Sequence, residues 1–546
     1  MGMKTLELKE FKGIDHRLHR DIADQRTVLV ADNVDMTTGG GFRCRDQLRK
    51  VATLDARSLG LYSLNGALRT ALPYAAGTLV GESPFPFTYD VFVTDKTPTR
   101  LASVCSWDGH AYLDVEVTDG SKTTYEHHFC ELGEQSGVIW LNPFGVSGGQ
   151  TQQFNVTSEI PHTEASEKVG ATVVIPNHGS FVIASATDTT ITTTLPVTGV
   201  SLLDSLACAI TGRRVTLVDV PFVPGPTVLT AAGKIFADDL ATNNISFSST
   251  QNGPRDWISA NDAGFLAAAN NADGARQIKA MATWFNKLIV FNTSSAQAWS
   301  VDPDPANMSF FATIGGAGIQ HTKAIANVQG DLVFYGRNAF RSISSNQYTG
   351  QPKTQNALGI AIKDLTANLD PKVQNLCSLW YPARDQYLCF NGNKVFVYLA
   401  ADEKQGWTTY TLPITVTACA ELDNQVYVRD DAGNVYVFDA EGVQEPGFAF
   451  DLRTQFLMGD ADNIIKKWNI LALVGTGGPV AVDFGLDSAD DAKVRKGFSV
   501  SNGSTNNKGR YPIMVTDPSL QIRFSGTSKT WTLDAIFVYY ESGALL

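Results

Sequence analysis

The sequence predicts an all-β protein whose main part is a β-propeller, and two observations carry this prediction. Helical periodicity is weak, whereas short alternating strands are separated by turn dipeptides such as Asn65-Gly66, Asp108-Gly109 and Asn391-Gly392. Closely spaced strands and turns of this kind are typical of all-β folds. The central region also repeats itself at intervals of roughly 40 to 50 residues, the length of a four-stranded propeller blade.

The repeat is clearest in two segments of thirteen residues. Residues 280–292, AMATWFNKLIVFN, align with residues 324–336, AIANVQGDLVFYG, at a shift of 44 residues. Looser copies of the pattern occur at 58–73, 378–399 and 418–439. One such meander cannot bury both of its faces, and radial stacking against neighbouring blades would bury them. A β-sandwich with similar hairpins is the alternative architecture.

The pattern divides the chain into four segments. They are 1–84, N-terminal strands and a first propeller segment; 85–225, an inserted β-rich domain; 226–450, the main propeller blades; and 451–546, a C-terminal β region. The insert is rich in Thr and Gly and ends at the Pro-rich PFVPGPTV. The C-terminal region either closes the propeller or forms a separate β-domain. Two short helices are expected, at 360–369 and 201–209.

Charge and cysteine content limit the possible partners. The net charge is −12 and the basic residues form only short groups, at Arg43, Arg45, Arg49, Lys50, Arg213, Arg214, Lys466 and Lys467. Tight binding of duplex DNA needs a basic stripe, whereas an acidic wall would let DNA pass. The seven scattered cysteines form no CxxC pair, which indicates buried free thiols and folding in a reducing compartment. We expect no signal peptide and no membrane span.

Residues 31–50, ADNVDMTTGGGFRCRDQLRK, are a candidate for a metal-binding or phosphate-binding loop. Counted from Asn33, this stretch has Thr38 and Cys44 where a calcium-binding EF-hand loop needs glycine and glutamate. Counted from Asp35, Gly40 fits the glycine position, but Asp46 replaces the glutamate, and Thr37 and Gly39 are poor ligands. The stretch also lacks the lysine of a phosphate-binding loop, and the residues after Gly41 are strand-like rather than helical. We therefore predict a strand, a glycine turn that requires positive φ and a returning strand.

Other motifs also favour structure over chemistry. Gly145 to Gly149 matches GxSxG, but no helix comes after the serine as a nucleophile elbow requires. Gly316-Ala317-Gly318 lacks the third glycine of a dinucleotide fingerprint. The pairs His16/His19 and His127/His128 have no ligand cluster around them, and on a strand His127 and His128 would point to opposite faces.

Acidic pairs and tryptophans are the candidates for a glycan site. Asp302/Asp304 and Asp490/Asp491 could serve a glycosidase only if two carboxylates lay a few ångströms apart, and solvated loop acids are the simpler interpretation. The tryptophans recur with the strands, which favours packing between blades over sugar binding; they are Trp257, Trp284, Trp299, Trp380, Trp407, Trp468 and Trp531. We therefore predict no enzyme activity and assign no catalytic, cofactor-binding or metal-binding residue, and no cofactor.

The N-terminal region has the pattern GI…R…A-x-NVD…GG-x-R-x-R. It falls at Gly13-Ile14, Asn33-Val34-Asp35, Gly39 to Gly41, Arg43 and Arg45. With segments at 243–258, 285–301, 314–344 and 381–410 and the ending WTLDAIFVYYESGA, it resembles tail nozzle proteins (tail tubular protein B-like) and related head–tail proteins of short-tailed bacteriophages. The resemblance covers most of the chain except 85–225.

The resemblance implies a virion structural protein that folds in the host cytoplasm. It implies a homo-oligomeric ring, a hexamer, around a channel for double-stranded DNA, in contact with a portal or adaptor protein and with tail fibres or other tail proteins. The family carries no catalytic residues, so none are transferred. A glycan-binding or glycan-hydrolysing propeller, or a fibre-adaptor or receptor-binding virion protein, are the alternatives. We expect valine at Gly39 to Gly41 to disturb folding or assembly.

Overall fold

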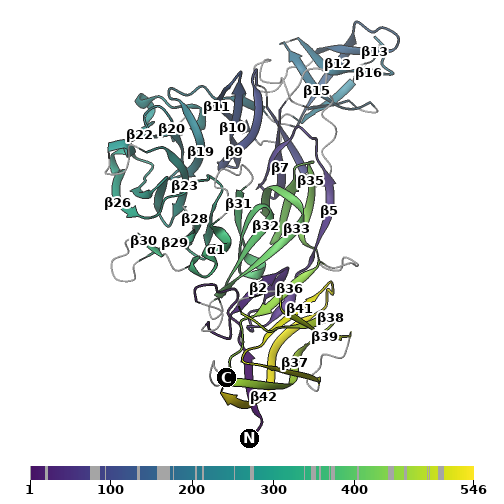
Figure 1. Ribbon diagram of the computed structural model, residues 1–546. Helices are drawn as coiled ribbons and strands as arrows, with labels where there is room; N and C mark the ends of the chain where they lie inside the picture. The colour runs from purple at the N-terminus through teal and green to yellow at the C-terminus, as the bar shows by residue number, and fades with distance from the viewer. Residues whose placement is uncertain are drawn as a thin grey trace.

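The computed structural model confirms the all-β prediction. It describes residues 1–546 except 1, 19–22, 74–86, 93, 132–135, 157–171, 176–177, 188, 203, 205, 212–213, 251–252, 271–275, 337–338, 346–351, 356–357, 368, 370–375, 402–404, 441–447, 460–463, 489, 491, 502–508 and 546. Figure 1 shows a barrel at one end of an elongated molecule, a propeller in the middle, and a sandwich that holds both termini at the other end.

Three consecutive four-stranded antiparallel sheets form the regular part of the propeller. Their strands are β19 (Pro224–Ala231), β20 (Lys234–Asp239), β21 (Ile245–Phe247), β22 (Gly264–Leu266); β23 (Ile278–Trp284), β24 (Lys287–Asn292), β25 (Ser295–Ser300), β26 (Ser309–Gly315); and β27 (Ile325–Val328), β28 (Asp331–Tyr335), β29 (Phe340–Ser345), β30 (Pro352–Gln355). The 44-residue repeat is confirmed, because its two copies cover the β23–β24 and β27–β28 hairpins. Leu288 and Leu332 occupy equivalent buried positions.

Two further blades depend on N-terminal strands for completion. β31 (Leu376–Tyr381), β32 (Gln386–Ala400) and the first half of β33 (Gln405–Leu422) are joined by β2 (Val28–Asp32), which runs parallel to β33. The second half of β33 pairs with β34 (Gln425–Asp430), which pairs with β35 (Asn434–Ala440), and β5 (Gln47–Thr53) completes that blade. The looser sequence repeats at 378–399 and 418–439 lie in these two blades.

The remaining two blades precede the regular part. One is β6 (Leu59–Leu64), β7 (Ala67–Pro73) and β8 (Phe87–Phe92), with β8 parallel to β7. The other is β9 (Thr97–Trp107), β10 (His110–Asp119), β11 (Lys122–Glu131) and β18 (Arg214–Leu217). Contacts link β33 to β6, β6 to β9, β9 to β19, β19 to β23, β27 to β31 and β31 to β33. Phe291 and Phe334, 5.3 Å apart, join the blades of β23 and β27, and the ring closes.

The insert is smaller than the predicted segment 85–225. β8 to β11 and β18, all inside that segment, belong to propeller blades, so only the part between β11 and β18 is inserted. That part is a closed six-stranded barrel, with strands β12 (Ser136–Phe144), β13 (Gln150–Val156), β14 (Thr172–Ile175), β15 (Gly179–Ala186), β16 (Thr190–Thr198) and β17 (Leu206–Thr211). The helix expected at 201–209 is wrong, because β17 begins there and extends the barrel.

The C-terminal region forms a two-sheet sandwich together with N-terminal strands. One sheet holds β1 (Lys4–Lys9), β3 (Val34–Met36), β4 (Phe42–Cys44), β37 (Ile464–Thr476), β40 (Arg510–Asp517) and β42 (Thr532–Leu545); the other holds β36 (Phe450–Thr454), β38 (Val480–Gly485), β39 (Val494–Val500), β41 (Gln521–Gly526) and β2. Phe450 and Trp531 stack between the two sheets at 4.9 Å. Of the two alternatives for this region, a separate β-domain describes it better than closure of the propeller.

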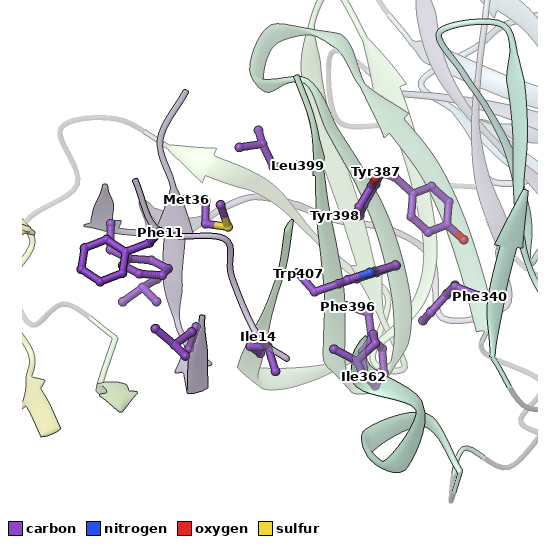
Figure 2. Close-up of a cluster of buried hydrophobic side chains, with 14 of the residues drawn as sticks. Phe11, Ile14, Met36, Phe340, Ile362, Tyr387, Phe396, Tyr398, Leu399 and Trp407 are labelled. Atoms are coloured by element: carbon purple, nitrogen blue, oxygen red, sulfur yellow. The ribbon is translucent and has the colours of Figure 1, made fainter. Parts of the chain in front are cut away.

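One hydrophobic core runs from the sandwich into the propeller. It includes Phe11 and Met36 from the N-terminal segment and Trp407 from β33. Figure 2 shows these side chains with Tyr387 from β32 of the same blade as Trp407 and with Phe340 from β29 of the neighbouring blade. A single helical turn, α1 (Lys363–Thr366), comes after the 3-10 turn Ile360–Ile362 beside this core, so the helix expected at 360–369 exists but is shorter.

Candidate functional site

The stretch at 31–50 forms the predicted hairpin. β3 and β4 are antiparallel, with Val34 opposite Cys44 and Met36 opposite Phe42. In the turn, Gly40 has φ of 79°, and a Cβ there would lie 2.8 Å from Glu10 Cα. A Cβ on Gly41 would lie 2.7 Å from the backbone oxygen of Leu533. The turn therefore needs glycine at both positions.

We expected substitution of Gly39 to Gly41 by valine to disturb folding or assembly, but Gly39 is less constrained than the other two glycines. A Cβ on Gly39 would have only the Thr37 hydroxyl within 4 Å, at 3.8 Å, and its φ lies outside the left-handed region. A side chain therefore fits at this position without strain.

On either side of the hairpin, the same stretch joins the two large units. β2 pairs with β36 of the sandwich and reaches β33 of the propeller at Asp32 and Thr409. After β4 the chain enters β5, the outer strand of the blade that contains β35. The hairpin is thus held at both of its ends by different units.

Asp35, at the centre of the hairpin, is the focus of a buried polar cluster. Its side chain is 1% exposed. Arg384 Nη1 lies 3.1 Å from Asp35 Oδ2, Tyr410 donates its hydroxyl to Oδ1, and Gln386 Nε2 lies 3.4 Å from Oδ1. Arg43 Nε lies 3.5 Å from Oδ2 on the exposed side. We call Asp35, Asp46, Asp439, Arg45, Arg384 and Tyr410 the junction cluster.

Arg384 binds three carboxylates of the junction cluster at once. Besides Asp35, its Nη1 lies 3.1 Å from Asp439 Oδ2, and its Nη2 donates to Asp46 Oδ2. The 3-10 turn Pro382–Arg384 between β31 and β32 places the guanidinium there. Breaking a buried pair of this kind by removing one partner leaves an uncompensated charge in the interior.

Asp439 is the carboxyl group of the junction cluster whose burial favours its protonated form. Arg45 and Arg384 face the three carboxylates, and Arg43 lies beside Asp35 on the exposed side. Burial raises the pKa of Asp439 to about 7, with Arg384 opposing and Asp35 adding to the rise. Burial alone would lower the pKa of Arg384, but attraction to Asp439 and Asp35 raises it above its ordinary value. Both pKa values are raised, so Arg384 stays charged while burial favours a proton on Asp439.

Arg45 is held among aromatic rings. Its guanidinium carbon lies 4.4 Å from the centroid of Tyr410, 4.8 Å from that of Phe438 and 4.4 Å from that of Phe448. Its Nε donates to the backbone oxygen of Asp46 at 3.0 Å. Burial lowers the pKa of Arg45. Cation–π contacts of this kind stabilise a buried guanidinium that has lost its contact with water. Arg45 therefore fixes the C-terminal end of the hairpin against the blade.

The motifs with alternative chemical interpretations lie in turns. Gly145, Gly148 and Gly149 have positive φ, and Ser147 forms a bridge with Gln150, so the GxSxG match is a hairpin turn of the barrel. Gly316 also has positive φ, and a Cβ on Gly318 would meet the backbone of Ser294. Both motifs therefore lie in turns of the β structure.

The described histidines of both pairs form hydrogen bonds or pack against neighbouring side chains. His16 Nδ1 and Asp364 Oδ2 are 2.6 Å apart, and its partner His19 lies outside the described residues. His127 lies 3.0 Å from the Tyr112 hydroxyl, whereas His128 packs against Phe92 on the other face of β11, as predicted. Burial lowers the pKa of His127 to about 3.

The acids and tryptophans considered for a glycan site have structural roles. Asp304 Oδ1 accepts from Ala306 N and caps a 3-10 turn. Asp490 accepts from Ala492 N, and Asp491 lies outside the described residues. All the tryptophans considered are buried except Trp380, which is partly buried. Trp284 Nε1 donates to Gly330 O of the next blade at 3.0 Å, which agrees with the packing interpretation.

The cysteines are largely internal. Of the basic groups, Arg45 and Lys466 are buried, whereas Arg49, Lys50 and Lys467 are exposed. Lys466 is buried, and its Nζ donates to the backbone oxygens of Ile464 and Pro518. Arg213 lies outside the described residues. The six described cysteines are free, five of them buried and Cys419 partly exposed. Nothing is described of the side chain of Cys208.

Two features are absent from the described part of the chain. No three His, Cys, Asp or Glu side chains among those residues come together as a metal site. Within the same residues, no helix is long and apolar enough to cross a membrane.

Comparison with known proteins gives likenesses in fold only. No family model and no curated protein matches the chain. Among solved structures, BamB from Moraxella catarrhalis is 10% identical with a TM-score of 0.34, over 72% of this chain and all of BamB. AztD from Citrobacter koseri is 10% identical with a TM-score of 0.27, over 71% and 99%. Virginiamycin B lyase from Staphylococcus aureus is 11% identical with a TM-score of 0.26, over 56% and 95%. Likenesses at this level say nothing of activity, and the propeller assignment rests on the sheet order.

Proposed function

We propose that this chain is a structural protein of a bacteriophage virion. In this proposal it is a tail nozzle in the virion tail, folded in the host cytoplasm, and has no catalytic role. Copies form a ring, a hexamer, that extends the portal or adaptor channel through which double-stranded DNA is retained and ejected. Tail fibres or other tail proteins would contact the same ring.

The observation that carries the proposal is where the family-like residues lie in the fold. Asp35 of the Asn33-Val34-Asp35 motif is the centre of the junction cluster. Gly40 and Gly41 have no room for a side chain. Arg45 is buried against three aromatic rings. The N-terminal residues that resemble the family are thus the ones that join sandwich to propeller, which is the expected place for a motif shared through a common architecture.

Shape and charge agree with this role. A propeller continued by a sandwich through one core is a rigid block, because closely packed interiors deform little. The net charge of −12 would repel the phosphate backbone, so DNA could slide past acidic surfaces without binding tightly.

The test is reconstitution of the full chain with a portal–adaptor complex from a short-tailed phage that encodes it. We expect electron micrographs to show a ring of this protein below the adaptor, with the chain alone as the control for self-assembly. A persistent monomer in the presence of the portal–adaptor complex would contradict the proposal. Density only on the fibres would instead favour a fibre adaptor.

A glycan array and a hydrolase screen separate the proposal from a carbohydrate-active propeller. We expect neither glycan binding nor hydrolysis. A defined polysaccharide substrate would overturn the proposal.

A further inference from the structure

Two cysteines meet at the interface between neighbouring propeller blades. Cys377 lies on β31 and Cys419 on the second half of β33, the inner strands of the two blades. These strands are in contact. Both side chains belong to the hydrophobic cluster that fills the space between the blades, and the Cys377 side chain is the largest cause of the raised pKa of Cys419.

A third cysteine nearby faces the other way. Cys389 on β32 is opposite Ser378, the neighbour of Cys377, in the antiparallel register. Side chains of successive strand residues point to opposite faces, and Cys389 packs into the core shared with the sandwich instead. It is fully buried. Cys389 is therefore a matched control, with the same blade and chemistry but the opposite face.

A lysine lies beside the cysteine pair. Ser378 N donates to the backbone oxygen of Lys323 at 2.9 Å, which fixes Lys323 next to Cys377. Lys323 Nζ donates to Leu101 O of β9 at 2.6 Å, so the side chain reaches a blade that is not adjacent to its own. The Cys377 thiol and then burial raise the pKa of Cys419, and the charge of Lys323 opposes that rise.

We propose that Cys377 and Cys419 form a reversible disulfide that staples these two blades when the protein meets a peroxide. Cys419 is the more exposed of the two and is the group that the oxidant reaches. The raised pKa of Cys419 keeps the thiolate scarce, so the reaction is slow and the reduced pair persists until oxidant is supplied. The inference does not depend on the proposed function.

The reaction balances with a peroxide as the only co-reactant. The Cys419 thiolate attacks one peroxide oxygen, the O–O bond breaks, and the departing hydroxide takes up a proton to become water. The resulting sulfenic acid is attacked at sulfur by the Cys377 thiolate. The S–S bond forms, the S–O bond breaks, and a second water leaves. Two thiols are oxidised and one peroxide is reduced to two waters.

The experiment uses the full-length protein, reduced, desalted and treated with hydrogen peroxide. Non-reducing peptide mapping should find the Cys377 peptide joined to the Cys419 peptide, with the intact mass lowered by two hydrogens. Dithiothreitol should reverse both changes. Because a cross-link restricts the unfolded chain, the oxidised protein should melt several degrees higher than the reduced one.

Variants distinguish this pair from other thiols. Cys377→Ser and Cys419→Ser should each abolish the bridge, whereas Cys389→Ser should form it as the unsubstituted chain does. Should a serine variant fail to fold, the peptide map of the unsubstituted protein decides alone. A bridge from Cys377 to Cys389, or over-oxidised cysteines with no bridge, would overturn the proposal.

Discussion

The barrel and the sandwich are both β-units attached to the propeller, yet they are attached in different ways. The barrel has a hydrophobic core of its own, built around Leu141, Phe154 and Ile183. The sandwich shares one core with the propeller and also shares the strand β2. An insertion between two strands of one blade can remain a separate module, whereas a unit that supplies strands to its neighbour becomes part of it.

Loss of Arg384 should have the largest effect, because it would separate the sandwich side of the junction from the propeller. Arg384→Ala removes the guanidinium that contacts both buried carboxyl groups, Asp35 and Asp439. We expect the free energy of unfolding to fall by about 3–5 kcal/mol, measured by chemical denaturation. Lys394→Ala removes a partly exposed pair with Asp32 and should cost only about 0–1 kcal/mol. Equal losses for both variants would show that the junction cluster does not hold the units together.

The glycines of the hairpin should give the next largest effect. Gly40→Ala puts a side chain at a positive φ and against Glu10, and Gly41→Ala puts one against the backbone of Leu533. We expect each to lower the free energy of unfolding by about 2–4 kcal/mol. Gly39→Ala is the matched control and should change it by less than about 1 kcal/mol. Thermal or denaturant melts of the three variants measure these changes in stability. A Gly39→Ala variant as unstable as the other two would contradict the turn conformation described above.

Titration of Asp439 should make the junction sensitive to pH. Its pKa of about 7 in the folded protein exceeds the value near 4 of an unfolded chain, so the folded state holds a proton that the unfolded state has lost. This contribution to stability is complete below pH 4, falls as pH rises towards 7, and is lost above it.

Asp439→Asn should remove that slope, which is at most about 1.4 kcal/mol for each pH unit. Denaturant melts at pH 5, 6, 7 and 8 measure it. The chain without its barrel should retain the slope of the unsubstituted protein, because Asp439 belongs to β35 and the junction cluster and not to the barrel. An unchanged slope in the asparagine variant would show that another group carries the proton.

Excision of the barrel should have the smallest effect on the rest of the molecule. Glu131 and Arg214 are partners in the register of β11 and β18, so the ends of the insert are adjacent. Replacing 132–213 by Asn-Gly, which suits a two-residue hairpin, should change the free energy of unfolding of the remainder by less than about 1 kcal/mol. Expressed alone, the barrel segment should unfold cooperatively. If the propeller unfolded when the barrel was removed, the barrel would be an integral part of the structure, as the sandwich is.

Local patterns predicted the regular blades, whereas long-range pairings escaped prediction. The repeat at 280–292 and 324–336 is visible because each hairpin pairs neighbouring segments. The blade of β9, β10 and β11 falls within the predicted insert because its fourth strand, β18, comes only after the whole barrel. No local sequence pattern indicates that β18 pairs with β11 after the inserted barrel.

The junction cluster could not be found for the same reason. The sequence singled out Asp35 and Arg45, but the partner Arg384 is 349 residues from Asp35. Arg45 belongs to a short basic group in the sequence, yet the folded chain leaves it only 3% exposed. A buried arginine beside an aspartate is indistinguishable in sequence from a solvated one until the opposing blade is placed.

The use of β5 as an outer strand affects how the protein is made. β5 is among the first strands to be synthesised, but its partner β35 begins at Asn434. At ~5–20 residues per second, the roughly 380 residues between them take about 20 to 75 seconds to translate. Throughout that interval the edge of β5 has no native partner and is open to pairing with other chains. Production of this protein should therefore depend on chaperones that shield the nascent N-terminal segment until the last blade emerges.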